Sequence, residues 1–262
     1  MTMPPALRGA LAAEWIKLWS VRSTWLALSF ALLSGVGLGL IDTVSVVRSW
    51  DTLPPADRAA FDAAGSAFSG LPLAQLAFGV LGVLVVAGEY ATGSIIPTLT
   101  AVPRRGLVYL AKAAVLAGTT LVFGETLAFG TFWLGQAVLA GHDLDADLGD
   151  PGILRAVSSA GLYLSVIAMI GFGLGALARQ PAVGVAALFA LVFLAYGVGR
   201  ALEGWSYLPS RLTLSNAGDV VGQVHATAAK PRLPSLRLAY LTLAMYVTLA
   251  LGGGGWRTAR DA

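Results

Sequence analysis

The chain has 262 residues, of which 56% are hydrophobic and only 12% are charged. Soluble domains carry roughly 25% charged residues, so this chain has about half the usual complement. Its mean hydropathy of +0.75 agrees with that deficit. Intrinsic disorder requires low hydrophobicity and high charge, and it is excluded. The composition therefore predicts a membrane protein, not a soluble enzyme with one buried core.

Several kinds of site are excluded by residue types or motifs that the sequence lacks. There is no Cys, which excludes disulfide frameworks, Cys-based zinc sites and thiol nucleophiles. His142 and His225 are too far apart in the chain for a paired-His metal motif. No lysine follows a glycine, so the phosphate loop of P-loop ATPases is missing and we expect no cofactor on this chain. We expect the net charge of +3 to face anionic membrane lipids, not nucleic acid.

Six stretches are long and apolar enough to cross a bilayer, which takes about 20 mostly apolar residues. Their hydrophobicity is continuous, whereas the strands of a membrane barrel alternate. The first begins only at Thr24 and is too long for a cleavable signal peptide, so we expect it to stay as an anchor. The predicted fold class is all-α with six transmembrane helices, at residues 24–41, 71–87, 113–140, 156–178, 182–199 and 238–255.

The distribution of basic residues gives an expected orientation, since six spans put both termini on one side. Termini in the cytoplasm place nine Lys and Arg residues inside and eight outside, or nine against three without the long last outer loop. Cytoplasmic loops of membrane proteins carry an excess of Lys and Arg. We therefore expect a multi-pass protein of the cell membrane with both termini in the cytoplasm.

A helical segment at residues 6–22 precedes the first span. On a helical wheel one broad face carries two leucines and two tryptophans, and the opposite face carries Ala10, Ala13, Glu14 and Lys17. Trp at headgroup depth with Lys toward water is typical of a helix that lies in the membrane interface. A cytosolic extension of the first span is the alternative.

The first inner segment, residues 88–112, is the most informative stretch of the sequence. It leaves the second span at Glu89, breaks at Gly93, continues with apolar residues and stops at Pro103 before Arg104 and Arg105. A short helix with an apolar side, bounded by Gly and Pro, suits docking to a cytosolic partner. An ordinary connection with basic membrane anchors is the alternative.

Two stretches resemble the permease subunits of bacterial ABC-2 type exporters. The run Glu89-Tyr90-Ala91-Thr92-Gly93-Ser94-Ile95, closing in Pro103-Arg104-Arg105, resembles the loop after the second helix of that family. The run Glu14-Trp15-x-Lys17, with Arg22-Ser23-x-Trp25 after it, is similar to the family's elbow helix. Chain length, six spans and a long last outer loop also fit. Ile96-Pro97 departs from the family, which usually carries a basic or polar pair there, and predicts a bend in the coupling helix.

The resemblance implies a permease subunit of an ATP-driven exporter of a drug, lipid or peptide. Two copies of a separate cytosolic ATPase would hold ATP and magnesium, and two permease chains, identical or related, would form the substrate pathway. The implied coupling residues are Glu89, Tyr90, Gly93, Ser94, Ile95, Leu99, Arg104 and Arg105, and the implied elbow residues are Glu14, Trp15, Lys17, Arg22 and Trp25. We expect Glu89 to pair with a basic group of the ATPase, and Ile95 and Leu99 to fill an apolar slot.

Glu125 is a lone carboxylate near the middle of the third predicted span. A charge there costs roughly 2.5–3.5 kcal/mol to insert, so the group must face protein or water, or be protonated. It is predicted to be either a substrate-path or gating group, or a protonated residue that holds helices together with Thr119, Thr120 and Thr126. An ion-coupled secondary transporter that uses Glu125 is the alternative function, although no internal repeat supports it. An intramembrane enzyme is a weaker alternative, because only this ionisable residue lies inside a span.

Two further features concern packing. Gly35-x-x-x-Gly39 and Gly171-x-x-x-Gly175 allow close helix approach, within the chain or across a dimer. The last outer loop, residues 200–237, mixes aromatic and aliphatic residues with few charges. This composition favours half-buried or re-entrant helices there, with a plain loop as the alternative.

Overall fold

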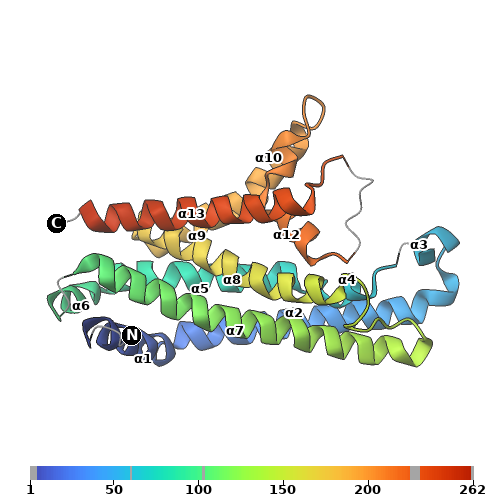
Figure 1. Ribbon diagram of the computed structural model, residues 1–262, viewed down its shortest axis with the longest axis horizontal. Coiled ribbons are helices and arrows are strands. Elements are labelled where there is room, and N and C mark those ends of the chain that lie inside the picture. Colours follow the sequence, from blue (N-terminus) through green and yellow to red (C-terminus); the bar gives the residue numbers. More distant parts are fainter. Residues whose placement is uncertain (1–4, 60, 102–103, 225–230, 261–262) are drawn as a thin grey trace.

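The computed structural model describes residues 5–59, 61–101, 104–224 and 231–260 of the chain. Six helices in these ranges are long and apolar enough to cross a membrane, and the same ranges contain no strand. The predicted all-α membrane fold with six spans is thus confirmed. Figure 1 shows that α1 (Pro5–Ser20) and the C-terminal end of α13 (Leu236–Arg260) lie at the same end of the bundle.

The spanning helices extend beyond the apolar stretches that predict them. The sequence places the first and third spans at 24–41 and 113–140, whereas the helices continue through charged residues such as Arg48 and Lys112. A helix needs apolar side chains only where it lies in hydrocarbon, so hydropathy marks the span and not the whole helix. The spanning helices are α2 (Arg22–Ser49), α5 (Leu71–Thr92), α7 (Arg105–Leu139), α8 (Ile153–Ala178), α9 with α10 (Pro181–Phe189 and Ala195–Ala201) and α13.

Short helices connect the spans at both ends of the bundle. The segment after α10 contains α11 (Leu208–Arg211) and α12 (Leu214–Gly222), and α12 packs on α8 and α13 with Leu214, Val220 and Val221 buried. Residues 225–230 of this segment lie outside the described ranges. The remaining short helices are η1 (Trp50–Thr52), α3 (Pro55–Ala59), α4 (Ala63–Ala67), α6 (Ile95–Ala101) and η2 (Ala140–His142).

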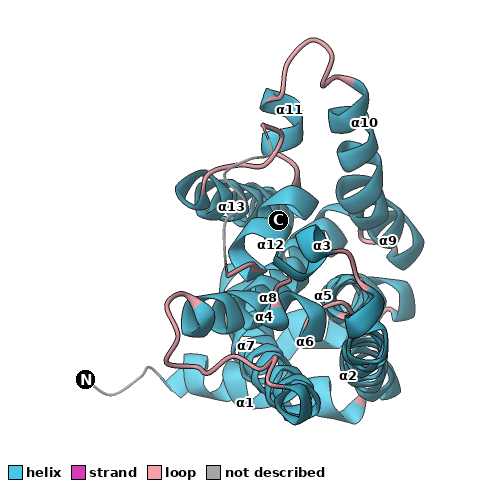
Figure 2. Ribbon diagram, turned by 90° about the vertical axis from the view of Figure 1, so that its right-hand side faces the viewer, coloured by secondary structure: helices cyan, strands magenta, loops and turns pink. Residues whose placement is uncertain are grey.

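Helix α8 occupies the centre of the bundle, with α4, α5, α7 and α12 around it (Figure 2). In its most apolar stretch 78% of the residues are buried, against 61% in α5 and 22% in α2, in α9 with α10 and in α13. The three least buried spans therefore form the periphery, where apolar side chains face outward from the chain.

Direct backbone contact joins α5 to α8. A side chain at Gly82 of α5 would collide with the carbonyl oxygen of Ala168, and one at Gly171 of α8 with the carbonyl oxygen of Gly79. Small residues allow such close approach between helices in membranes, where packing replaces the hydrophobic effect as the driving force. The α5–α8 contact therefore depends on glycine at these positions.

Both glycine motifs of the sequence pack within the chain. Gly171 and Gly175 face α5, and Gly35 and Gly39 of α2 face Leu127 of α7 and the backbone of α4. The spacing allows close helix approach either within the chain or across a dimer. In the structure both motifs make close contacts within the chain.

Replacing Gly82 by Leu should destabilise the bundle, because the new side chain would separate α5 from α8. Overpacking of this kind costs about 3 kcal/mol, or roughly 6–12 °C in Tm for a chain of this size. The matched control is Gly118→Leu in α7, where an added Cβ would meet no neighbouring atom within 4 Å. Thermal unfolding of the purified protein in detergent measures both, and an equal Tm for the two variants would contradict the packing described here.

Candidate functional site

Helix α5 ends at a glycine that leads directly into α6. Gly93 has a φ of 72°, in the left-handed region that favours glycine, and its N–H donates to the carbonyl of Tyr90. Pro97 lies in the first turn of α6, where the backbone N–H groups have no partner inside the helix anyway. The bend that Ile96-Pro97 predicts is therefore absent, and α6 runs unbroken from Ile95 to Ala101.

Helix α1 lies crosswise to the spanning helices, as Figure 2 shows along the bundle. Val21 has an extended backbone (φ −92°, ψ 127°) and separates α1 from α2, so α1 is not a continuation of the first span. The sequence analysis groups Glu14 with Lys17 on the face of this helix opposite the tryptophans. Glu14 and Leu18 are buried against the bundle, while Trp15 is exposed.

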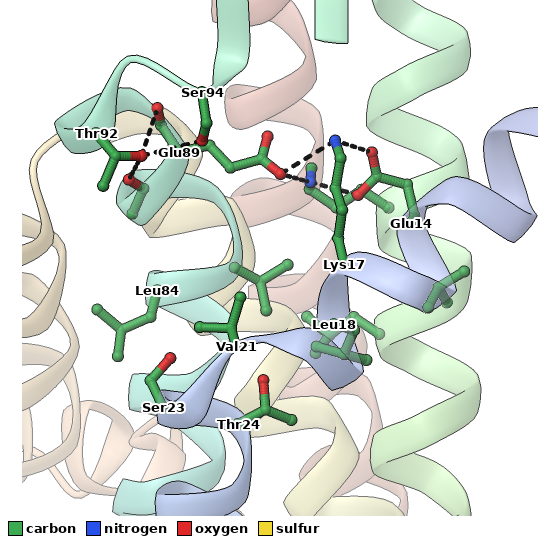
Figure 3. Close-up of a pocket in the computed structure, with 15 residues that line it drawn as sticks. Glu14, Lys17, Leu18, Val21, Ser23, Thr24, Leu84, Glu89, Thr92 and Ser94 are labelled. Atoms are coloured by element: carbon green, nitrogen blue, oxygen red, sulfur yellow. Dashed lines mark hydrogen bonds and ion pairs between the residues drawn. The ribbon is translucent and has the colours of Figure 1, made fainter. Parts of the chain in front are cut away.

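Four charged side chains meet where α1, α5 and α7 converge (Figure 3). Lys17 donates to Glu14 Oε1 over 2.9 Å and to Glu89 Oε1 over 3.3 Å. Lys112 donates to Glu89 Oε1 over 2.7 Å and to Glu14 Oε2. These four residues form what we call the buried charge cluster, in which each ammonium contacts both carboxylates.

The buried charge cluster has no net charge, and three of its four side chains are largely shielded from water. The side chains of Glu14 and Lys112 are each 5% exposed, and that of Glu89 is 14% exposed. Removing a charge from water is tolerated only when partners replace the water, and losing one partner of a buried pair typically costs about 3–5 kcal/mol. The cluster therefore holds α1 to α5 and α7 as long as all four groups are present.

Lys17 also reaches α6. Its ammonium donates to Thr98 Oγ1 over 2.8 Å. Burial lowers the pKa of Lys17, but the hydrogen bonds and negative charges of Glu14 and Glu89 outweigh this effect and raise the pKa above its ordinary value. A raised lysine pKa keeps the ammonium charged through neutral pH, and its contribution to stability is lost only in strongly alkaline solution.

The position of Glu89 differs from the expected one. The sequence analysis assigns it to a basic group of a partner protein, whereas its Oε1 accepts from Lys17 and Lys112 of its own chain. Its Oε2 is buried and has no hydrogen-bond partner among the described residues. In this structure Glu89 links α5 to α1 and α7.

Helix α6 presents a different isoleucine to the outside from the expected one. Ile96 is 66% exposed, and Pro97 and Thr100 beside it are exposed as well. Ile95 instead lines a cavity of about 250 Å³ with Tyr109 and other residues of the bundle. The outward apolar side chain of α6 is therefore Ile96, and the side chain of Leu99 lies outside the described part.

The other predicted coupling residues surround that cavity or flank it. Tyr90 lines it and carries the guanidinium of Arg179 over its ring, 5.1 Å from the centroid. Arg105 lines it too, while Arg104 is exposed at the start of α7. Ser94 is exposed and instead lines a second cavity, of about 260 Å³, beside the buried charge cluster.

The elbow residues divide between the bundle and an aromatic group on the surface. The rings of Trp15 and Trp19 lie 5.5 Å apart, and those of Trp19 and Trp25 lie 5.1 Å apart. Trp25 donates its Nε1 proton to the carbonyl of Trp19 over 3.1 Å. Arg22 is exposed at the start of α2. Glu14 and Lys17 are thus the two elbow residues that the structure brings to Glu89.

Lys112 is the cluster residue that sequence reasoning missed as a site residue. In the sequence it appears only as the basic end of the inner segment, 98 positions from Glu14. A signal was available, because a lysine that opens a long apolar run must find an anion when its helix is packed. The two carboxylates on the same predicted side of the membrane, Glu14 and Glu89, were the candidates.

Glu125 stands apart from this cluster. It is partly buried in α7, and its backbone and carboxyl carbon lie against Gly161 of α8. Thr120 bonds to the carbonyl of Leu116 and to Ser165 Oγ, and Thr126 bonds to its own helix, so neither shares a hydrogen bond with Glu125. Glu125 also lines neither of the two cavities described above.

Among the described residues, no group of three or more His, Cys, Asp or Glu side chains could hold a metal ion. The contacts at the α1/α6 end are ion pairs and hydrogen bonds between side chains of one chain. This arrangement suits mechanical connection of helices, because it joins four separate segments through charges that must stay paired.

Replacing Lys112 by Met should destabilise the protein by about 3–5 kcal/mol, because the Lys112 ammonium is buried and water cannot take its place beside the two carboxylates. Lys17→Met should cost about 1 kcal/mol or less, since the Lys17 side chain is 36% exposed. The double variant Glu14→Gln/Lys112→Met should recover part of the loss, because the remaining cluster is neutral again. Thermal unfolding compares the three, and a Lys112 variant no weaker than the Lys17 variant would refute the role of burial.

Comparison with known proteins adds no name to this site. The chain matches no protein-family model, and no curated protein and no solved structure is significantly similar to it.

Proposed function

We propose that the chain is the permease subunit of an ATP-driven exporter and that α6 docks on a separate cytosolic ATPase. The observation that carries this proposal is how α6 is held. Its outward side bears the exposed Ile96, while Thr98 bonds to Lys17 of the buried charge cluster. An exposed apolar anchor on a short helix suits a groove of a partner protein.

The buried charge cluster supports the proposal by offering a path for force. A push on α6 reaches Lys17 through Thr98, and reaches α5 directly through the short turn at Gly93. The four charges resist separation, because Glu14, Glu89 and Lys112 would otherwise be left buried without their partners. Since α5 packs backbone to backbone on α8, a displacement of α5 acts on the centre of the bundle.

The expected assembly contains two permease chains, identical or related, and two ATPase subunits that bind ATP and magnesium. The resemblance of residues 89–95 and 103–105 to the ABC-2 exporter loop motivates this composition. Only 22% of the residues are buried within the chain in the most apolar stretches of the peripheral spans α2, α9 with α10, and α13, which suits contact with lipid or a second permease. In this assembly the chain itself does not hydrolyse ATP.

The proposal requires the α1/α6 end to face the cytoplasm. Single cysteines can test it cleanly, because the chain has no native Cys. Cysteine at Asp57 or Asp145, which are exposed at the opposite end, should react with a membrane-impermeant thiol reagent added outside intact cells. Cysteine at Arg104 should react only after the cells are opened, and the reverse pattern would overturn the orientation.

Ile96→Asp should weaken association with the ATPase at least tenfold, because it places a carboxylate where an apolar anchor is needed. The measurement is co-purification from cells that also express a P-loop ATPase encoded beside the chain's own reading frame. Ile95→Val keeps the inward packing side chain and should leave association unchanged. Membrane insertion should be the same for both variants, and Ile96→Asp should leave the Tm unchanged, since Ile96 packs against little of the bundle.

Leu208→Asp is a second control, since Leu208 is 57% exposed but lies at the opposite end in α11. It should bind the ATPase like the unaltered chain. If Ile96→Asp kept full association and full transport, or if the unaltered chain bound no such ATPase, the coupling role of α6 would be wrong.

A further inference from the structure

A cavity of about 420 Å³ lies at the end of the bundle opposite the buried charge cluster. It is lined by residues of the start of α5, of α8, of the junction of α9 and α10, and of α12, which are neighbouring helices in Figure 2. Its volume falls within the range of about 300–1,000 Å³ that is usual for small-molecule sites.

Two polar side chains on the inner side of this cavity are hydrogen-bonded to their surroundings. Tyr163 of α8 donates its hydroxyl proton to Gln75 Oε1 of α5 over 2.6 Å, and both side chains are buried. Gln75 in turn donates from Nε2 to the carbonyl of Pro72 over 3.1 Å. These bonds fix the tyrosine ring in place, so the wall is shaped before any ligand arrives.

The opposite wall is formed where the fifth span departs from regular α-helix. Residues Ala190–Leu194 form a π-helical turn, a rare geometry that occurs frequently at functional sites. The carbonyl of Val192 in this turn accepts a hydrogen bond from Ser215 Oγ of α12 over 2.8 Å. Phe193, next in the chain, lines the cavity and is 51% exposed.

The charged groups around the cavity are unequal in sign. Among the described residues that line it, Asp219 is the only charged one, and it also has other interactions within the chain. Arg155 of α8 and Arg200 of α10, on two of the helices that line the cavity, contact other groups. Arg200 Nε lies 3.5 Å from Glu203 Oε1, and Arg155 donates to backbone carbonyls at the end of α12.

We infer that this cavity binds a hydrophobic organic cation. Aromatic rings attract cations over their faces, and four aromatic residues line the cavity together with the carboxylate of Asp219. An anion of the same shape would meet the same apolar surface but the opposite electrostatic interaction. Naming such a cation as exported cargo rests on the proposed function, whereas its binding to the cavity does not. The four aromatic residues are Phe68, Tyr163, Phe193 and Tyr196.

Two probes of nearly equal size and opposite charge test this inference. Tetraphenylphosphonium and tetraphenylborate are added to the full chain in lipid nanodiscs, with empty nanodiscs of the same lipid subtracted. We expect saturable binding of tetraphenylphosphonium and no saturable binding of tetraphenylborate. Saturable binding of both with equal affinity would overturn the charge preference.

A cysteine reporter locates the bound probe. Gly222 lines the cavity, and a Cβ added there would meet no neighbouring atom within 4 Å, so Gly222→Cys should fold normally. Tetraphenylphosphonium should slow alkylation of this cysteine at least fivefold and leave a cysteine at Asp57 unaffected. Saturable binding without protection at Gly222 would place the site elsewhere and refute the inference.

Two variants test the residues that carry the inference. Asp219→Asn removes the charge at constant size and should raise the Kd for tetraphenylphosphonium by about fivefold to tenfold. Phe193→Ala removes an exposed ring and should raise it by about threefold or more. Asp57→Asn removes a charge at the same end of the bundle, away from the cavity, and should leave the Kd unchanged. An unchanged Kd in Asp219→Asn, with an unchanged Tm, would overturn the role of the carboxylate.

These binding tests use no ATPase, so their outcome is separate from that of the coupling test. Failure to bind the cation would leave the docking role of α6 intact. Cation binding together with failed ATPase association would leave a binding cavity in a membrane protein of another function.

Discussion

The direct backbone contact between α5 and α8 determines the position of both ends of α5. Because a side chain at Gly82 would collide with α8, and one at Gly171 with α5, the two helices have one close register. That register brings Gln75 beside Tyr163 at one end and carries Glu89 to Lys112 at the other. Helix α5 thus runs from the cavity of about 420 Å³ at one end of the bundle to the buried charge cluster at the other.

The two ends of α5 solve the problem of polar groups in apolar surroundings differently. At the cavity end, neutral groups bond to one another and leave a polar wall that a ligand can contact. At the cluster end, full charges are used, and they occupy one another's hydrogen-bonding positions. Neutral hydrogen bonds permit exchange with a ligand at modest cost, whereas separating buried ions is expensive. The first end is therefore suited to binding and the second to connection.

The fold class could be predicted from the sequence because the length and hydropathy of an apolar stretch are read along the chain, without knowledge of its contacts. The cluster did not follow, because the contact between Glu14 and Lys112 joins positions far apart in the chain and depends on how α1 crosses the bundle. The choice between Ile95 and Ile96 also needed the structure. In a helix of seven residues, periodicity shows that neighbouring side chains point apart but not which one faces the bundle. The ion pairs of the buried charge cluster and the orientation of α6 both depend on how the helices pack against one another.

The neutrality of the buried charge cluster has an electrical consequence. Moving one elementary charge through a membrane potential of 100 mV involves about 2.3 kcal/mol. Two ammonium groups and two carboxylates that shift together carry no net charge across the field, so the membrane voltage does no net work on them. A displacement of the four cluster side chains as a unit is therefore not driven by the membrane voltage. A cluster with only three of these charges would carry a net charge, and the membrane voltage would do work on it when it moved.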